Sequence, residues 1–444
     1  MGGSTNSGDF PFGGIGYNTN GVTVYIGEKV TRIPDHTFGY FMSWIPEENK
    51  ITDVVFASGS VCEYIGLCAF DSCKYLVNIN LPDSVEYIGR YAFSYCNALS
   101  LSEYDNALYL GNENNPYLVL LKAKDKSIST CYLHPNAKII YDIAFYDCKL
   151  LETIIISEEI VQIGEDAFYN CNSLKFTEYQ NALYLGNSTN PYHALIKAKD
   201  KSITHCTSHQ DTRVVAGNAF RECNNLTNVI ISGLILNISA NTFSSCESLT
   251  SVLIPDSVKY IGYSAFIYCS SLKSINLPTQ LIQIGGNAFS GCTSLTKTSI
   301  PNGTKIISAY AFSDCYALTT FEIPDSVFYI GRWCVDRCES LESVTLSESM
   351  TLIKDGMFYY CTSLKYLFIP KSIMGIESMA FYNCSPNTIL YKGTSSEWNN
   401  IIIFNDYGYN SPIIYATRYY YSETTPTNAG NYWHYVNGEP TIWQ

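Results

Sequence analysis

Apolar and polar positions recur along this chain in one short pattern, which is clearest from Leu249 to Cys269. Written LxxIxIPxSVxxIGxxAFxxCxx, the pattern opens with alternating apolar residues, as expected of a short half-buried strand. Pro255 ends this strand because it lacks the amide hydrogen that a further strand residue would donate. A second short extended stretch follows and turns at Gly262. The aromatic and the cysteine, three residues apart, then suit one helical or 3₁₀ turn.

The pattern returns with a period of 23 residues along most of the chain. Its cysteine position is held by Cys73, Cys96, Cys148, Cys171, Cys223, Cys246, Cys269, Cys292, Cys315, Cys338, Cys361 and Cys384. Successive members lie 23 residues apart except at two steps of 52, each of which is one period plus a 29-residue insert. A fixed period between about 20 and 50 residues is typical of a solenoid, in which each unit buries its apolar face against its neighbours. We therefore expect one elongated solenoid domain.

This repeat resembles that of the BspA-like leucine-rich repeat family of bacterial and protist surface proteins, over twelve registers from about Ile51 to Cys384. The resemblance implies a right-handed leucine-rich-repeat superhelix that is rich in β-structure, with short helical turns and a parallel sheet on its concave side. It also implies adhesion or protein binding as the function.

Two inserts interrupt the pattern at the same position, after Leu99 and after Leu174, and are near copies of each other. Each has an apolar run, an Asn-rich stretch with a proline and a second apolar run, which predicts β-hairpins near 100–127 and 175–202. Two turns of the solenoid separate the hairpins, so we expect that they can pack into one flanking sheet. Two interpretations stay open: duplication of a 75-residue unit whose hairpins cover an edge, or a lateral docking ledge.

The two ends of the chain depart from the repeat, as the terminal units of a solenoid must. Residues 1–20 are rich in Gly, Ser and Asn and predict a flexible lead, and the altered repeat from Val22 to Phe38 predicts an N-terminal cap over 21–50. The repeat region then extends over 51–384. Beyond it, Ser-Ser-Glu-Trp predicts a short capped helix, and aromatic-rich segments predict a β-rich C-terminal cap over 385–444. This tail resembles closing segments of surface repeat proteins from gut Firmicutes.

The 17 cysteines suggest disulfides or a metal site, but their positions favour packing in the core. Besides the twelve in register, Cys62, Cys131, Cys206 and Cys334 replace inward apolar residues, where a thiol acts as a small apolar group. Cysteines in register on successive turns point the same way, whereas a disulfide needs its Cβ atoms to face each other. No CxxC pair is present. We expect neither a disulfide nor a metal, and only Cys68 at the surface near the regular repeats.

Charge and composition narrow the classes of partner. The net charge is −13 and the pI is near 4.9, with scattered Lys and Arg, so nucleic acid and anionic membranes are poor partners. No run of about 18 apolar residues exists, so we expect no membrane span. Met1 leads into Gly-Gly-Ser-Thr rather than into a signal peptide. A cytosolic protein and a mature chain without its signal both fit, and the resemblance favours the second, an extracellular or cell-surface protein.

Catalysis finds little support in the residues. The six histidines are dispersed, and His205 and His209, which flank Cys206, would not meet on one side of an extended segment. No Gly-rich phosphate loop or nucleophile motif stands out. We therefore expect no enzyme and no cofactor.

Binding is the better class, because outward strand positions can vary while inward ones hold the fold. Among them, the predicted binding residues are Tyr366, Phe368, Thr345, Glu322, Asn276, Asn80 and Asn78. Among these residues, Tyr366 and Phe368 are predicted to contribute most of the binding energy, unless the C-terminal cap folds over them. The sequence thus predicts an extracellular adhesin or protein-binding module, with a host matrix protein or mucin as partner and weak self-association also allowed. The alternative is a structural or self-associating surface scaffold.

Overall fold

The structure is a computed structural model of the chain, and it describes residues 21–39, 50–384, 386–437 and 439–443. The flexible lead predicted over 1–20 and part of the predicted N-terminal cap, 40–49, lie outside the described residues. The chain divides into two compact units. The first holds the described residues up to 197 with 209–219 and 235–240, and the second holds 198–208, 220–234 and the described residues from 241 onward.

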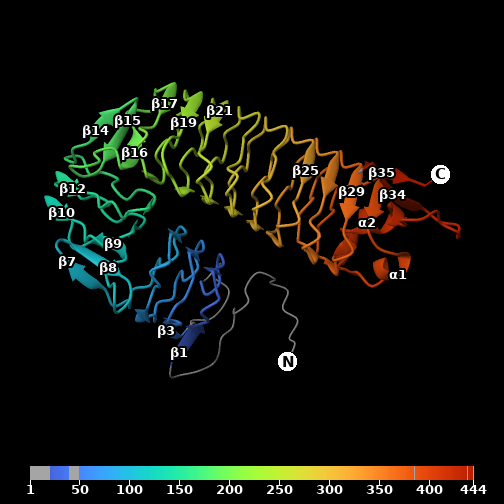
Figure 1. Cartoon of the computed structure of the whole chain (residues 1–444), viewed down its shortest axis with the longest axis horizontal. Coiled ribbons are helices and arrows are strands. Elements are labelled where there is room, and N and C mark those ends of the chain that lie inside the picture. The colour runs from blue at the N-terminus through green and yellow to red at the C-terminus, as the bar shows by residue number, and fades with distance from the viewer. Residues whose placement is uncertain (1–20, 40–49, 385, 438, 444) are drawn as a thin grey trace. The chain divides into compact units, whose positions relative to one another are not determined.

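The first unit contains two series of short strands, one for each strand of the repeat (Figure 1). The first series is β1 (Val22–Ile26), β3 (Ile51–Phe56), β5 (Asn78–Ile79), β10 (Thr130–Tyr132) and β12 (Thr153–Ile155). The second series is β2 (Arg32–Ile33), β4 (Tyr64–Ile65), β6 (Tyr87–Ile88), β11 (Ile139–Ile140), β13 (Gln162–Ile163), β18 (Val214–Val215) and β20 (Asn237–Ile238). The altered first repeat belongs to this stack, because β1 pairs in parallel with β3 and β2 with β4.

The second unit contains strands of the same two kinds. Its first strands form two sheets. One sheet consists of β17 (His205–Thr207), β19 (Asn228–Ile230) and β21 (Ser251–Leu253). The other begins with β25 (Thr320–Glu322), β27 (Ser343–Thr345), β29 (Tyr366–Ile369) and β31 (Thr388–Tyr391), and is extended by the C-terminal strands β33 (Thr417–Tyr421), β34 (Tyr432–Val436) and β35 (Glu439–Ile442). Its second strands are β22 (Tyr260–Ile261), β23 (Gln283–Ile284), β24 (Ile306–Ile307), β26 (Tyr329–Ile330), β28 (Leu352–Ile353), β30 (Gly375–Ile376) and β32 (Ile402–Ile403). All pairs between neighbouring strands are parallel except β34 with β35.

Helix is scarce in this β-solenoid, which confirms the predicted fold class. The described residues contain the short helices α1 (Ser395–Trp398) and α2 (Ser411–Tyr415) and one 3₁₀ turn, Asp406–Gly408. Helix α1 is the predicted Ser-Ser-Glu-Trp helix. Thr394 caps its first turn, since the hydroxyl accepts a hydrogen bond from the Glu397 amide while the Glu397 carboxylate accepts one from the Thr394 amide.

The segment after each second strand folds as consecutive hydrogen-bonded turns rather than as a helix. Cys73 donates its amide hydrogen to the Phe70 carbonyl over 3.1 Å, and Ser72 between them has a φ of 61°. A second left-handed residue, Cys68, precedes Ser72 by four positions, and both positions are left-handed in each of the twelve regular repeats. Because a right-handed helix excludes such residues, the amide of Phe70 bonds instead to the carbonyl of Ala92 in the next repeat, over 2.8 Å.

The aromatic and cysteine positions form two ladders in the core. The rings of Phe243 and Phe266 stack with centroids 5.0 Å apart. The Cys269 thiol donates to the Phe243 carbonyl over 3.1 Å, and this carbonyl also accepts the amide hydrogen of Cys246, over 3.1 Å. The same thiol contact recurs at Cys96, Cys171, Cys246, Cys292, Cys315, Cys338 and Cys361. Every cysteine except Cys68 is buried, so the predicted placement in the core is confirmed.

Each insert contributes three strands. The first insert forms β7 (Ser102–Tyr104), β8 (Ala107–Leu110) and β9 (Val119–Ala123), and the second forms β14 (Thr177–Tyr179), β15 (Ala182–Leu185) and β16 (Ala194–Ala198). The predicted hairpin is confirmed in the first insert, where β8 and β9 are antiparallel around the Asn-rich loop. The expected common sheet is wrong, because β9 pairs with β11 and β16 with β18, each in a sheet of its own.

Strands β9 and β11 separate two clusters of buried side chains in the first unit. Val119 and Ile139 face one cluster, while Leu120 and Ile140 face the other. All four side chains are fully buried. Since successive residues of a strand face opposite sides, a strand that merely covered an edge would leave one side in solvent. The first insert is therefore an interior wall of the fold.

Side chains replace part of the main-chain ladder where the first insert interrupts the repeats. The Tyr91 amide, which corresponds to the Cys68 amide of the preceding repeat, donates to Asp142 Oδ2 over 3.2 Å. The Gln162 side-chain amide bonds both main-chain groups of Ile88, over 2.7 and 2.8 Å. Burial raises the pKa of Asp142 to about 6. A buried polar seam thus links the repeats on either side of the insert.

Candidate binding surfaces

The first strands of the second unit place one residue inward and its two neighbours outward. Val229 of β19 and Val252 of β21 are buried, and the parallel register sets Ile230 beside Leu253. The same arrangement holds in β25, β27 and β29. The outward positions of this unit, which we call the outer strand face, are His205, Thr207, Asn228, Ile230, Ser251, Leu253, Ser274, Asn276, Lys297, Ser299, Thr320, Glu322, Ser343, Thr345, Tyr366 and Phe368.

One apolar pair interrupts the polar character of this face. Ile230 is 43% exposed and Leu253 is 55% exposed. The other outward residues of the same two strands, Asn228 and Ser251, are polar. Neither Ile230 nor Leu253 is among the predicted binding residues. The signal in the sequence is an apolar residue at the same outward position of two successive repeats. Exposed apolar side chains that lie side by side mark a surface that gains free energy when a partner covers it.

The predicted aromatic pair is split by the C-terminal cap. Tyr366 is 48% exposed, whereas Phe368 is half-buried and meets the ring of Trp433 edge-on, with centroids 6.4 Å apart. Trp433 of β34 is buried, and its Nε1 donates to the Tyr391 carbonyl over 3.0 Å. The cap therefore packs on Phe368 and leaves Tyr366 open to solvent.

The other predicted binding residues lie in both units. Thr345, Glu322 and Asn276 are exposed on the outer strand face. Asn78 and Asn80 belong to the first unit, where Asn78 donates to Asp53 over 2.8 Å. The Asn80 side chain bonds both main-chain groups of Phe56, over 2.7 and 3.1 Å. Its amide therefore holds the end of β3.

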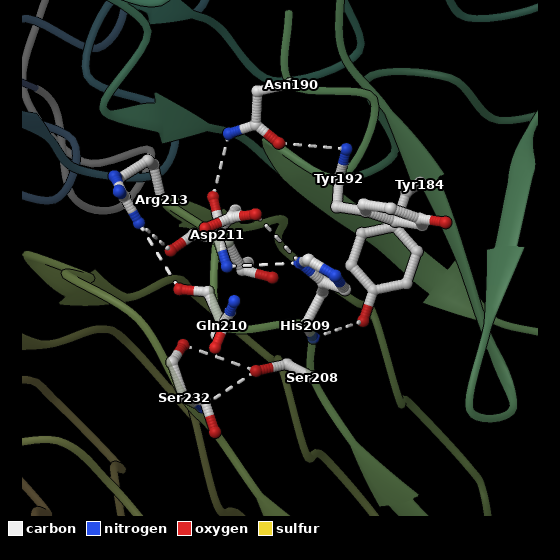
Figure 2. Close-up of polar contacts among 10 residues, drawn as sticks. Tyr184, Asn190, Tyr192, Ser208, His209, Gln210, Asp211, Arg213 and Ser232 are labelled. Atoms are coloured by element: carbon white, nitrogen blue, oxygen red, sulfur yellow. Dashed lines mark hydrogen bonds and ion pairs between the residues drawn. The ribbon is translucent and has the colours of Figure 1, made fainter.

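The second insert carries a cluster of aromatic rings where it meets the next repeat, as Figure 2 shows. Tyr192 and His209 stack with centroids 4.1 Å apart, and Tyr179 meets His209 edge-on at 4.9 Å. His209 accepts the Asp211 amide hydrogen at Nδ1 over 3.2 Å and donates its own amide hydrogen to the Tyr184 hydroxyl over 3.3 Å. These contacts fix the imidazole to the hairpin.

The first insert repeats this cluster with its own residues. Tyr117 and His134 stack with centroids 4.0 Å apart, and Tyr104 meets His134 edge-on at 4.8 Å. His134 accepts the Asn136 amide hydrogen over 3.2 Å. Partial burial lowers the pKa of His134, which keeps the ring neutral near pH 7. Since both histidines are held by stacking and by local hydrogen bonds, the clusters join each hairpin to the repeat that follows it.

In the described part of the chain, the two histidines that flank Cys206 have separate contacts. His205 contacts the Thr204 hydroxyl over 3.2 Å, while His209 is held in its stack. Among the described residues, no group of three or more His, Cys, Asp and Glu side chains is arranged to hold a metal ion. Burial raises the pKa of Cys206 to about 12, so its thiol is protonated and a poor nucleophile at neutral pH. No helix in the described ranges is long and apolar enough to cross a bilayer.

Comparison with known proteins identifies the repeat. Residues 46–113, 123–190, 198–297 and 282–407 match the family described as BspA type Leucine rich repeat region (6 copies). A leucine-rich cell surface protein from Faecalibacterium prausnitzii is similar at 23% identity over 68% of this chain and 97% of its own, with a TM-score of 0.28. A leucine-rich repeat protein from T. pallidum is 25% identical over 49% of this chain and 86% of its own, with a TM-score of 0.33. No curated protein matches the chain.

Proposed function

This chain belongs to the BspA-type leucine-rich repeat family, and we propose that it binds another protein through the outer strand face of its second unit. The observation that carries this proposal is that each short strand buries one residue in the core and exposes its neighbours to solvent. Phe321, Val344 and Leu367 are fully buried, while Glu322 and Thr345 beside them face solvent. Outward side chains can therefore be exchanged without loss of the core, which is what a recognition surface requires.

Two places on this face suit the centre of an interface. Covering Ile230 and Leu253 would remove two adjacent apolar side chains from water, each contributing roughly 1 kcal/mol when half of its surface is already buried. Tyr366 offers a large amphipathic ring with little entropy to lose on binding. The polar residues around them supply hydrogen bonds at the rim. The resemblance to BspA-like proteins implies a place outside the cell or on its surface, with host matrix proteins and mucin as the first partners to test.

The test is capture of matrix proteins, mucin and a labelled copy of the same chain by the immobilised protein. We compare the double variant Ile230→Ser/Leu253→Ser and the single variant Tyr366→Ala with the control Leu234→Ser, which changes an exposed apolar residue outside the face. Circular dichroism checks that each variant folds. We expect at least one of the face variants to weaken capture roughly tenfold, as the loss of about 1.4 kcal/mol requires, and the control to bind normally.

Three outcomes separate the hypotheses. Loss of a matrix protein or mucin in the face variants supports the proposal. Capture that no face variant weakens contradicts it. Capture of the labelled copy alone favours the structural or self-associating scaffold.

A further inference from the structure

An apolar patch lies on the second strands of the last repeats in the second unit. Six large apolar or aromatic side chains are exposed to solvent there, in β26, β28 and β32 or directly beside β26, β30 and β32. We call this set the second-strand patch; it comprises Phe328, Tyr329, Leu352, Met374, Ile402 and Phe404. Ile402 and Met374 are the most exposed members, at 64% and 62%. The patch shares no residue with the outer strand face.

The order of the repeats brings these side chains side by side. Leu352, Gly375 and Ile402 are register neighbours on β28, β30 and β32. A Cβ atom on Gly375 would lie 2.8 Å from Leu352 Cδ2, so the leucine side chain extends over the glycine that separates it from Ile402. The repeat that contains β26 adjoins the repeat of β28, because the Trp333 amide donates to the Asp355 carbonyl over 3.0 Å. The six side chains therefore form one continuous surface.

The core does not account for apolar side chains at these positions. Gln283 and Ile306 hold the position of Tyr329 in the two preceding repeats, and both are buried. Tyr329 and its counterpart Leu352 are each 37% exposed instead. The position of Phe328 is held by a lysine in the preceding repeat, so a charged residue suits the fold there equally well. Exposed apolar side chains gathered on one surface point to a partner that covers them.

The area of the patch matches one side of a dimer interface. The exposed fractions amount to about three whole side chains, and a large side chain presents about 150–250 Å², so the patch offers on the order of 600 Å². Two copies that cover each other's patch bury on the order of 1,200 Å², which is the lower limit for specific, stable interfaces. The polar residues around the patch add to this area.

Opposite charges stand at the two ends of the patch. Lys305 is exposed beside Phe328, whose amide donates to the Lys305 carbonyl over 3.1 Å. Asp406 is exposed at the other end, in the turn that follows β32. Over the residues that the structure describes, neither of these charged groups forms an ion pair. A surface with a positive and a negative end is complementary to a second copy of itself that lies in the opposite direction.

We propose that the second-strand patch joins two copies of this chain in a dimer with two-fold symmetry. In such an interface each surface meets the same surface of the other copy, so Lys305 of either copy faces Asp406 of the other. The apolar side chains fill the middle and lose their contact with water in both copies. These self-complementary charges favour a second copy over an unrelated protein, and the net charge of −13 disfavours an anionic membrane.

The experiment is analytical ultracentrifugation of the intact chain over a range of concentrations. The buffer contains about 0.15 M salt, where screening over about 8 Å limits the repulsion between two acidic copies. Met374→Glu and Ile402→Glu each place a charge within the patch. The matched control Leu253→Glu adds the same charge at an exposed apolar strand residue outside it. Lys305→Glu and Asp406→Lys each reverse one end, and the double variant exchanges the two charges.

We expect the intact chain and the control to sediment as dimers at micromolar concentration. Met374→Glu and Ile402→Glu should each weaken the dimer at least tenfold, and each single charge reversal should weaken it several-fold. The double variant should restore the dimer, because each reversed charge again meets its opposite. Circular dichroism of every variant checks that the fold persists.

Four results would overturn the proposal: a monomer at every concentration, a dimer that survives both glutamate substitutions in the patch, growth into species larger than a dimer, or a double variant no tighter than the single reversals. Loss of the dimer in Leu253→Glu alone would assign self-association to the outer strand face instead. Because the two surfaces share no residue, this proposal and the proposed binding of another protein can fail separately.

Discussion

Replacing Cys269 with alanine measures what the thiol ladder contributes to one repeat. Cys269→Ala removes the sulfur that donates to the Phe243 carbonyl over 3.1 Å. That carbonyl keeps its second hydrogen bond, from the Cys246 amide over 3.1 Å, so the change leaves no buried polar group without a partner. The cost then consists of lost packing and one weak hydrogen bond.

The size of this cost follows from three contributions. Losing the buried sulfur forfeits about 1 kcal/mol of transfer free energy, close to that of one methylene group. A remaining cavity on the order of 20 Å³ adds about 0.5 kcal/mol. The S–H donor is weak, and its hydrogen bond contributes about 0.5 kcal/mol. We therefore expect the free energy of unfolding to fall by about 2 kcal/mol.

Cys269→Ser decides whether the thiol acts as a donor or only as an apolar filler. A serine hydroxyl can also donate to the Phe243 carbonyl. If this hydrogen bond stabilises the fold, we expect the serine variant to be more stable than the alanine variant. In a purely apolar site, burying a hydroxyl costs about 1–3 kcal/mol, and the order reverses. Urea unfolding under reducing conditions, followed by circular dichroism, gives the order, with Cys68→Ala as a control outside the ladder. A serine variant less stable than the alanine variant would refute the role assigned to the S–H group.

Three further predictions concern strain, pH and thiol reactivity. Ile143 is exposed with a φ of 53°, so Ile143→Asn, which tolerates this conformation better, should stabilise the fold by about 1 kcal/mol and raise the melting temperature. Burial raises the pKa of Asp336 from 3.8 to about 6, so its stabilising contribution is complete below pH 3.8 and is lost as pH rises through about 6. Asp336→Asn should therefore be more stable near pH 7, by on the order of 3 kcal/mol, and urea unfolding at several pH values across this range should show a flatter pH dependence for the variant. A thiol reagent applied to the folded chain should label only Cys68, and slowly, because burial raises its pKa to about 12; labelling of several thiols before unfolding would contradict the buried ladder.

The residues of the repeat predicted the strands and the core well. Leu249 to Cys269 places Val252 and Cys269 inside, and both are buried. The prediction of a helical or 3₁₀ turn after each second strand is wrong, because an aromatic and a cysteine three residues apart fit the observed β-turns equally well. Residues such as Ile143 and Trp333 disfavour left-handed backbone, so local preference points away from the observed turns. Hydrogen bonds to the neighbouring repeat override that preference.

The outward positions of the strands also follow from the pattern, but their surroundings do not. Alternation places Tyr366 and Phe368 on one side of β29. Whether they are open depends on Trp433, which comes from a segment with no repeat to set its position. Sequence spacing likewise cannot show that the rings of Tyr382 and Tyr409 meet, because Tyr409 lies beyond the regular repeats.

What this sequence determines by itself is the repeating unit: its two strands, its inward residues and its ladders of phenylalanine and cysteine. These are determined because every repeat meets the same surroundings, a copy of itself on either side, so one local pattern specifies the packing of all. Only the tertiary structure decides where the inserts go and which side chains bridge them. The Gln162 amide satisfies Ile88, 74 residues earlier, and β9 becomes a wall between two cores. Such contacts join segments that the period does not relate, and their geometry exists only once the chain has folded.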